Sequence, residues 1–167
     1  MTMKLQIGVI GAGTCDAQLQ EKAKQVGQEI AKNDAFLLCG GLGGVMEAAS
    51  KGAREAGGTT VGIVPGNDRD SPNPYIDIAI LTNMGHARNA IIAQSCDALI
   101  AVGGEYGTLS EIALSLKMGK SVITLESKWD IEGTTRADSP QQAVKLAIEA
   151  AKKSKSAHIS SSNPMGQ

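Results

Sequence analysis

The segment ALIAVGGEYGTLSEIALSLKMG, residues 98–119, contains the features that decide the fold class. Residues 98–102 are all apolar, which is typical of a short strand buried on both faces of a parallel sheet. A glycine-rich turn follows at 103–108, and residues 109–118 then have the pattern of a helix that Gly119 ends. A buried strand, a glycine turn and a helix in this order predict one unit of an α/β domain.

The same alternation of strands and helices continues through most of the chain. It predicts a mostly parallel sheet with helices on both faces, in a Rossmann-like, doubly wound α/β fold. We expect residues 1–151 to form a single ligand-binding domain and the Lys- and Ser-rich residues 152–167 to form a polar tail without regular structure of its own. The expected strands are 5–10, 35–39, 59–64, 76–81, 98–102 and 121–125, and the expected helices are 18–32, 44–56, 87–95, 109–118 and one that begins at 139–142.

The composition of the 167 residues argues against several classes of partner. Apolar residues make up 42% of the chain and aromatic residues only 2%, so Ala, Val, Ile, Leu and Met must build the core. With a net charge of −1 and few aromatic rings, nucleic acid is not an expected partner. The lack of a signal-peptide pattern and of a long apolar run favours a cytoplasmic protein with no membrane association. Cys15, Cys39 and Cys96 are isolated, so we expect neither disulfides nor a metal site.

Three of the expected strands end in glycine-rich turns, at 11–14, 40–44 and 103–108. In a doubly wound sheet such turns gather beyond the carboxyl ends of the strands, where free N–H groups at helix starts attract anions. The sequence therefore predicts a cleft for a phosphate-bearing ligand; the alternative is that each glycine only shapes its own turn. The candidate ligand-binding residues are Gly11, Gly13, Thr14, Gly41, Gly43, Gly44, Arg88, Asn89, Gly103, Gly104, Glu105, Tyr106, Gly107 and Thr108.

Two charged residues near these turns each have two interpretations. Arg88 suits bidentate binding of phosphate, and a surface arginine is the alternative. Glu111 could stabilise positive charge on a sugar ring or orient a water molecule. However, Thr108 and Glu111 also have the spacing of a capping box, with Thr108 as the N-cap, and spacing alone favours that role. His86 is interpreted as an exposed loop histidine.

The chain resembles the Lonely Guy (LOG) superfamily, long labelled "possible lysine decarboxylase", through GGLGGVMEA at 40–48 and GGEYGTLSE at 103–111. The characterised enzymes of that group are cytokinin riboside 5′-monophosphate phosphoribohydrolases, which cut the bond between a base and ribose 5-phosphate. The resemblance implies that Arg88 and Glu111 are the catalytic pair if this chain is an enzyme. Decarboxylation is not supported, since no lysine lies in a recognisable pyridoxal-phosphate motif.

Residues 85–89 and 103–111 look like those of a sister branch, which includes the molybdenum cofactor carrier proteins of algae and cyanobacteria. The enzymes have Arg-Lys where this chain has Arg88-Asn89. The resemblance implies a homo-oligomer that binds the phosphate-bearing pterin of the molybdenum cofactor, protects it from oxidation and has molybdoenzymes as recipients. The carrier is the favoured function; a phosphoribohydrolase and a nucleotide-sensing module remain the alternatives.

The helices expected at 87–95 and 109–118 are apolar around much of their circumference. A helix of this kind needs cover on more than one side. We therefore expect a symmetric dimer that buries them, or a tetramer built from two dimers.

Overall fold

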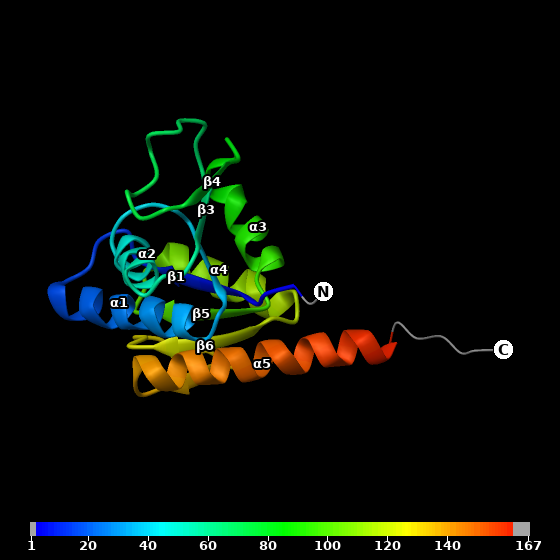
Figure 1. The fold of residues 1–167 in the computed structure, drawn as a ribbon. Coiled ribbons are helices and arrows are strands. Elements are labelled where there is room, and N and C mark those ends of the chain that lie inside the picture. The colour runs from blue at the N-terminus through cyan, green and yellow to red at the C-terminus, as the bar shows by residue number, and fades with distance from the viewer. Residues whose placement is uncertain (1–2, 162–167) are drawn as a thin grey trace.

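In the computed structural model, which describes residues 3–161, seven parallel strands form one sheet in the order β4-β3-β2-β1-β5-β6-β7 (Figure 1). The architecture confirms the predicted Rossmann-like, doubly wound fold. The strands are β1 (Gln6–Gly11), β2 (Phe36–Cys39), β3 (Thr60–Val64), β4 (Ile78–Leu81), β5 (Ala98–Val102), β6 (Ser121–Leu125) and β7 (Thr135–Ala137). The helices are α1 (Ala17–Lys32), α2 (Val45–Glu55), α3 (Arg88–Ser95), α4 (Tyr106–Lys117) and α5 (Pro140–Ser161), and a 3₁₀ turn, η1 (Gly85–Ala87), precedes α3.

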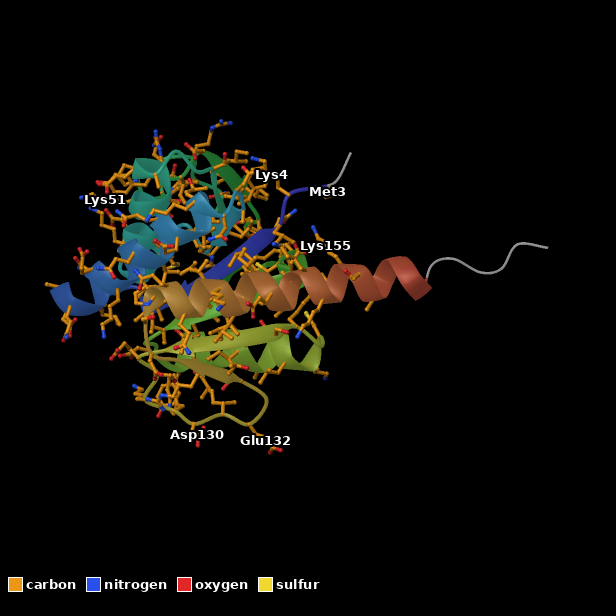
Figure 2. All side chains as sticks on the ribbon, turned by 60° about the horizontal axis from the view of Figure 1, so that its bottom comes forward. Met3, Lys4, Lys51, Asp130, Glu132 and Lys155 are labelled. Carbon is orange, nitrogen blue, oxygen red and sulfur yellow. The ribbon has the colours of Figure 1, made fainter. Side chains whose placement is uncertain are left out.

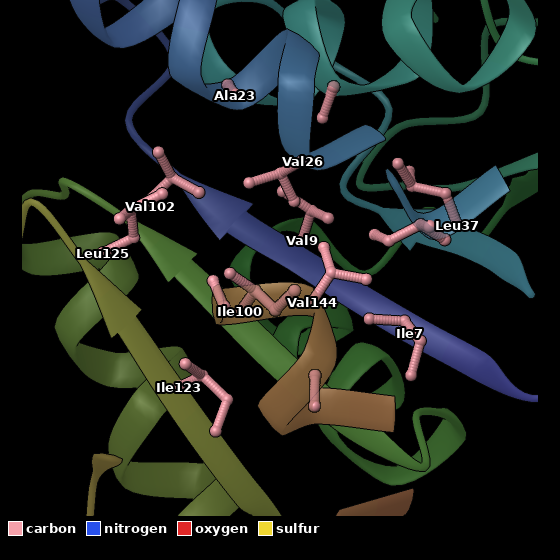
Figure 3. Packing of buried hydrophobic residues seen from close by; sticks show 14 of the residues in the cluster. Ile7, Val9, Ala23, Val26, Leu37, Ile100, Val102, Ile123, Leu125 and Val144 are labelled. Atoms are coloured by element: carbon pink, nitrogen blue, oxygen red, sulfur yellow. The ribbon is translucent and has the colours of Figure 1, made fainter. Parts of the chain in front are cut away.

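Helices cover both faces of the sheet, because successive strand residues point to opposite sides. Val9 of β1 belongs to the core beneath α1, α2 and α5, whereas the next residue, Ile10, belongs to the core beneath α3 and α4. Figure 3 shows Val26 of α1 and Val144 of α5 in the first of these cores. Small and aliphatic side chains fill both layers, as the composition predicts.

Helices α1 and α2 pack unusually close together. A Cβ atom on Gly27 of α1 would lie 1.9 Å from the carbonyl oxygen of Ala49, and one on Gly52 of α2 would lie 1.9 Å from that of Lys24. Two glycines, one on each helix, thus allow backbone-to-backbone contact. This contact joins the middle of α1 to the middle of α2.

Two differences from the expected elements lie near the C-terminal end of the described chain. Strand β7 was not expected, since three residues with the sequence Thr-Arg-Ala show no apolar run. Helix α5 begins as predicted, with Ser139 Oγ accepting a hydrogen bond of 3.1 Å from Gln142 N. The expectation that 152–167 lacks regular structure is wrong for 152–161, because α5 continues through them and projects beyond the sheet (Figure 1); residues 162–167 lie outside the described part.

Lys155 makes two polar contacts between the distal half of α5 and the body of the protein. Lys155 Nζ lies 3.4 Å from Asp97 Oδ2 and donates to the carbonyl oxygen of Met3, also at 3.4 Å. Figure 2 shows Lys155 and Met3 on the same side of the molecule. The N-terminal end of β1 is thereby tied to α5.

The strand order reverses between β1 and β5, from which the chain winds outward in both directions. In open α/β sheets, ligands bind outside the carboxyl ends of the strands at such a reversal. No helix in the described residues is both long and apolar enough to span a bilayer.

Candidate functional site

Two adjoining hollows lie at the carboxyl ends of β1 and β5. The first has a volume of about 350 Å³ and the second about 280 Å³, and they share Ala12, Thr14 and Glu105. We call them together the glycine groove. The first hollow is also lined by Gly11, Gly13, Met46, His86, Arg88, Asn89, Gly107, Thr108 and Glu111, and the second by Cys15, Asp16, Leu19, Gly103, Gly104, Glu126 and Lys128.

The structure brings the first and third glycine turns together at the groove, but the glycines of the second turn do not line it. Neither Gly41 nor Gly43 lines the glycine groove, and Gly44 lines a separate hollow between α1 and α2. A Cβ atom on Gly44 would lie 2.3 Å from the carbonyl oxygen of Ala12, and Val45 N donates to that oxygen at 3.0 Å. In this structure the second turn therefore packs against the backbone of the first turn and supports it.

Helix α4 begins inside the third turn, at Tyr106, three residues earlier than expected. The preceding amide, Gly103 N, donates to Leu125 O at 2.8 Å, and the next amide to find a carbonyl is Leu109 N, which donates to Glu105 O at 3.0 Å. Within the described residues, the five amides of 104–108 have no hydrogen-bond partner. Consecutive free N–H groups at a helix start, which carries a partial positive charge, form an anion-binding site.

The capping-box interpretation of Thr108 and Glu111 is wrong. Because the helix starts at Tyr106, Thr108 lies within its first turn, and the residue in the N-cap position is Glu105, whose side chain makes no capping hydrogen bond. Thr108 is buried and lines the first hollow. Glu111 is thereby free of any capping role and also lines the hollow.

Arg88 is buried at the start of α3 and fastened to the sheet. Its Nη1 donates to the carbonyl oxygens of Gly40, at 2.7 Å, and Ile63, at 2.5 Å, which follow or belong to β2 and β3. Its Nε is buried and has no partner among the described residues. Burial lowers the pKa of Arg88 and the charge of Glu111 opposes that shift, but an arginine remains protonated. Among the described residues, the Nε–H of Arg88 is left without an acceptor, and the residue itself lines the first hollow.

The position of Arg88 depends on Gly40, a residue that the sequence did not identify as part of the site. A Cβ atom on Gly40 would lie 2.3 Å from Arg88 Nη1. Glycine at this position leaves the space that the guanidinium occupies. The sequence carried no signal for this role, because the two residues are 48 positions apart.

Glu111 projects from α4 and is 8% exposed. Burial raises its pKa to about 7, although the positive charge of Arg88 lowers it. Among the described residues, its carboxylate accepts no hydrogen bond and forms no direct ion pair with Arg88. Near neutral pH the carboxyl group can therefore accept or donate a proton.

The remaining predicted residues take different places. Asn89 is buried and lines the first hollow beside Arg88. His86, in η1, is exposed, as expected. It also lines the first hollow and therefore belongs to the candidate site. Tyr106 lines neither hollow and is 82% exposed.

A doubly wound sheet with a groove at the β1/β5 reversal defines a Rossmann-like α/β protein with a candidate ligand site, and comparison with known sequences gives the family. The chain belongs to the SLOG cluster4 family, whose model matches residues 4–161. A protein of uncharacterised function from Archaeoglobus fulgidus is 52% identical over 152 residues, which are 90% of this chain and all of that protein.

Characterised enzymes match over a shorter stretch. The cytokinin riboside 5′-monophosphate phosphoribohydrolase of Mycobacterium tuberculosis is 36% identical over 105 residues, which are 60% of this chain and 56% of the enzyme. The corresponding enzyme of Rhodococcoides fascians is 33% identical over 106 residues, 60% of this chain and 52% of the enzyme. The match thus spans about half the length of these enzymes.

Solved structures match over nearly the whole chain. The molybdenum cofactor binding protein of Rippkaea orientalis has a TM-score of 0.84 and 39% identity, over 89% of this chain and 98% of that one. The Moco carrier protein of Chlamydomonas reinhardtii has a TM-score of 0.82 and 37% identity, over 90% and 99%. These matches confirm the resemblance to the LOG superfamily and to its branch with the cofactor carriers. DNA processing protein A of Streptococcus pneumoniae, at 21% identity, shares only the fold.

Proposed function

We propose that this protein binds and carries the molybdenum cofactor, with the terminal phosphate of the pterin on the free amides of 104–108. Those five unpartnered amides at the start of α4 are the observation that carries the proposal. The similarity to two cofactor-binding proteins, over about nine-tenths of this chain, supports the choice of ligand.

The residues around the amides fit an anionic ligand. Arg88 has a buried N–H without a partner among the described residues, and Thr108 and Asn89 add polar side chains to the same hollow. A charged donor and backbone amides make short hydrogen bonds to phosphate oxygens. Glu111 can stay protonated beside an anion, since its pKa is already raised to about 7.

The test is survival of the cofactor in air. Cofactor released from a molybdoenzyme is mixed with the purified protein, and the fraction still active is followed with time. We expect the protein to slow decay, and Gly104→Val to abolish the protection, because Gly104 has a φ of 128° and a Cβ atom there would lie 2.7 Å from Thr108 Cγ2. Gly119→Ala, at the far end of α4, is the matched control. Decay as fast with the protein as without it refutes the proposal.

A phosphoribohydrolase is the second candidate, and one observation favours it. Arg88 and Glu111 line the same hollow, and a carboxyl group with a pKa of about 7 can protonate a leaving base. Incubation with adenosine 5′-monophosphate and its N6-substituted derivatives tests this candidate by release of free base. Release that Glu111→Ala abolishes would replace the carrier proposal with the enzyme.

We also infer a cytoplasmic homo-oligomer, with residues 1–151 as the ligand-binding domain and molybdoenzymes as recipients. Strand β4 is an edge strand with apolar side chains at the surface: Ile78, Ile80 and Leu81 are 52%, 46% and 37% exposed. Apolar surface of this kind supports contact with a second copy. The burial of α3 and α4 in such a contact stays a prediction. Light scattering that shows only monomer at micromolar concentration refutes this inference.

A further inference from the structure

Two of the few aromatic side chains of this protein meet at the surface. The chain has one Trp, two Tyr and one Phe, and the rings of Tyr106 and Trp129 lie 6.3 Å apart between centroids with their planes at 40°. Tyr106 is 82% exposed. Trp129 is half-buried. An aromatic ring contributes most when it is covered, so the exposed ring of Tyr106 can gain contact from a flat partner.

Both residues border the glycine groove through their neighbours in the chain. Tyr106 lies between Glu105 and Gly107, which both line the first hollow. Lys128, next to Trp129, lines the second hollow together with Glu105. The aromatic pair therefore lies at the rim of the groove, beside the free amides at the start of α4.

Local contacts fix the backbone that carries the two rings. Tyr106 is the first residue of α4. The loop after β6 is closed at Trp129 by Ser127, whose Oγ accepts from Trp129 N at 3.2 Å and donates to Trp129 O at 3.0 Å. Asp130, the next residue, is at the outer edge of this loop (Figure 2). A backbone that is fixed before binding reduces the entropy lost when a ligand covers the rings.

We propose that Tyr106 and Trp129 form a stacking platform for the flat heteroaromatic ring of a phosphate-bearing ligand. This inference rests on the proposed function, because the amides of 104–108 must hold the phosphate that brings the ring to the platform. Stacking accepts any flat π surface, so the platform selects pterin and purine monophosphates over sugar phosphates. Lys128 Nζ, 4.8 Å from the centre of the Trp129 ring, keeps a positive charge at the platform.

Calorimetric titration of the purified full chain with three probes tests the platform. The probes are a pterin monophosphate, adenosine 5′-monophosphate and ribose 5-phosphate, which has the phosphate but no heteroaromatic ring. We expect Tyr106→Ala to weaken binding of the first two about tenfold, within the range for base stacking, and to leave ribose 5-phosphate within about twofold. Tyr106→Phe keeps the ring and restores affinity, and Tyr75→Ala, a tyrosine outside the groove, is the matched control.

The single tryptophan supplies a second readout. The two ring-bearing probes should quench the emission of Trp129, and ribose 5-phosphate should not. Equal loss of all three probes in Tyr106→Ala, or no loss of any, overturns the platform and leaves the carrier proposal standing. If adenosine 5′-monophosphate binds by stacking and the pterin monophosphate does not bind, the platform proposal is supported and the carrier proposal is refuted. If no probe binds the wild-type protein, both proposals are refuted.

Discussion

Replacing Glu111 by glutamine should change how the stability of this protein depends on pH. Burial raises the pKa of Glu111 from 4.5 to about 7 in the folded protein, so the folded state binds more protons than the unfolded chain between these two values. Because the pKa of Glu111 is raised in the folded protein, the protonated carboxyl group makes its full contribution to stability below pH 4.5. That contribution is lost as the pH rises through 7. A shift of about 2.5 units corresponds to about 3 kcal/mol at about 1.36 kcal/mol per unit. The amide of the Glu111→Gln variant carries no charge and escapes this loss.

The measurement is urea unfolding of both proteins, followed by circular dichroism, at pH 5, 6, 7 and 8. The two free energies of unfolding should be similar at pH 5, and at pH 8 the variant should be more stable by about 3 kcal/mol. Other titrating groups cancel in the difference, because both proteins contain them. Glu132→Gln, at an exposed residue of the loop shown in Figure 2, should give a constant difference. A constant difference for Glu111→Gln as well would show that its carboxyl group is solvated, and would refute the reasoning.

Three further changes test other parts of the structure. Arg88→Met removes the donor to two buried carbonyl oxygens and should lower the free energy of unfolding by about 3 kcal/mol, which is a fall in Tm of about 6–12 °C. Its control, Arg54→Met, is at a half-exposed ion pair and should lower the free energy of unfolding by less than about 1 kcal/mol. Gly27→Ala should lower stability by about 2 kcal/mol in thermal unfolding, since its methyl group meets the backbone of α2, whereas Gly107→Ala meets nothing and should gain up to about 1 kcal/mol from helix propensity. If the proposed oligomer uses the β4 edge, Ile80→Lys should convert it to monomer in light scattering; an unchanged oligomer mass would place the interface elsewhere.

The sequence predicted best where side-chain pattern alone determines the structure. The bounds of β5 and β6 are those expected, because five consecutive residues of strand-forming type lie between polar or glycine neighbours in each case. The start of α4 was missed, since Tyr106-Gly107-Thr108 has the composition of a turn and only the tertiary structure makes it helical. β7 was missed because its pairing with β6 is a long-range contact and its sequence carries no pattern.

The site was predictable residue by residue only in part. Arg88, Asn89 and Thr108 line the groove, as does Glu111. The sequence of the second glycine turn did not distinguish it from the other two turns. In the structure the second turn differs because it is more deeply buried: Gly41 is buried, and its carbonyl oxygen accepts a hydrogen bond from Asn73 N at 2.8 Å. His86 was set aside because the path of η1 back to the groove has no local signature.

The contact between Gly40 and the guanidinium of Arg88 has a consequence for how such chains can diverge. A Cβ atom at position 40 would meet the end of the Arg88 side chain, so the guanidinium could not keep its present position. A chain that replaces Gly40 could therefore keep an arginine at position 88 and still lose its charge from this part of the groove wall. We expect substitutions at the two positions to occur together across the family.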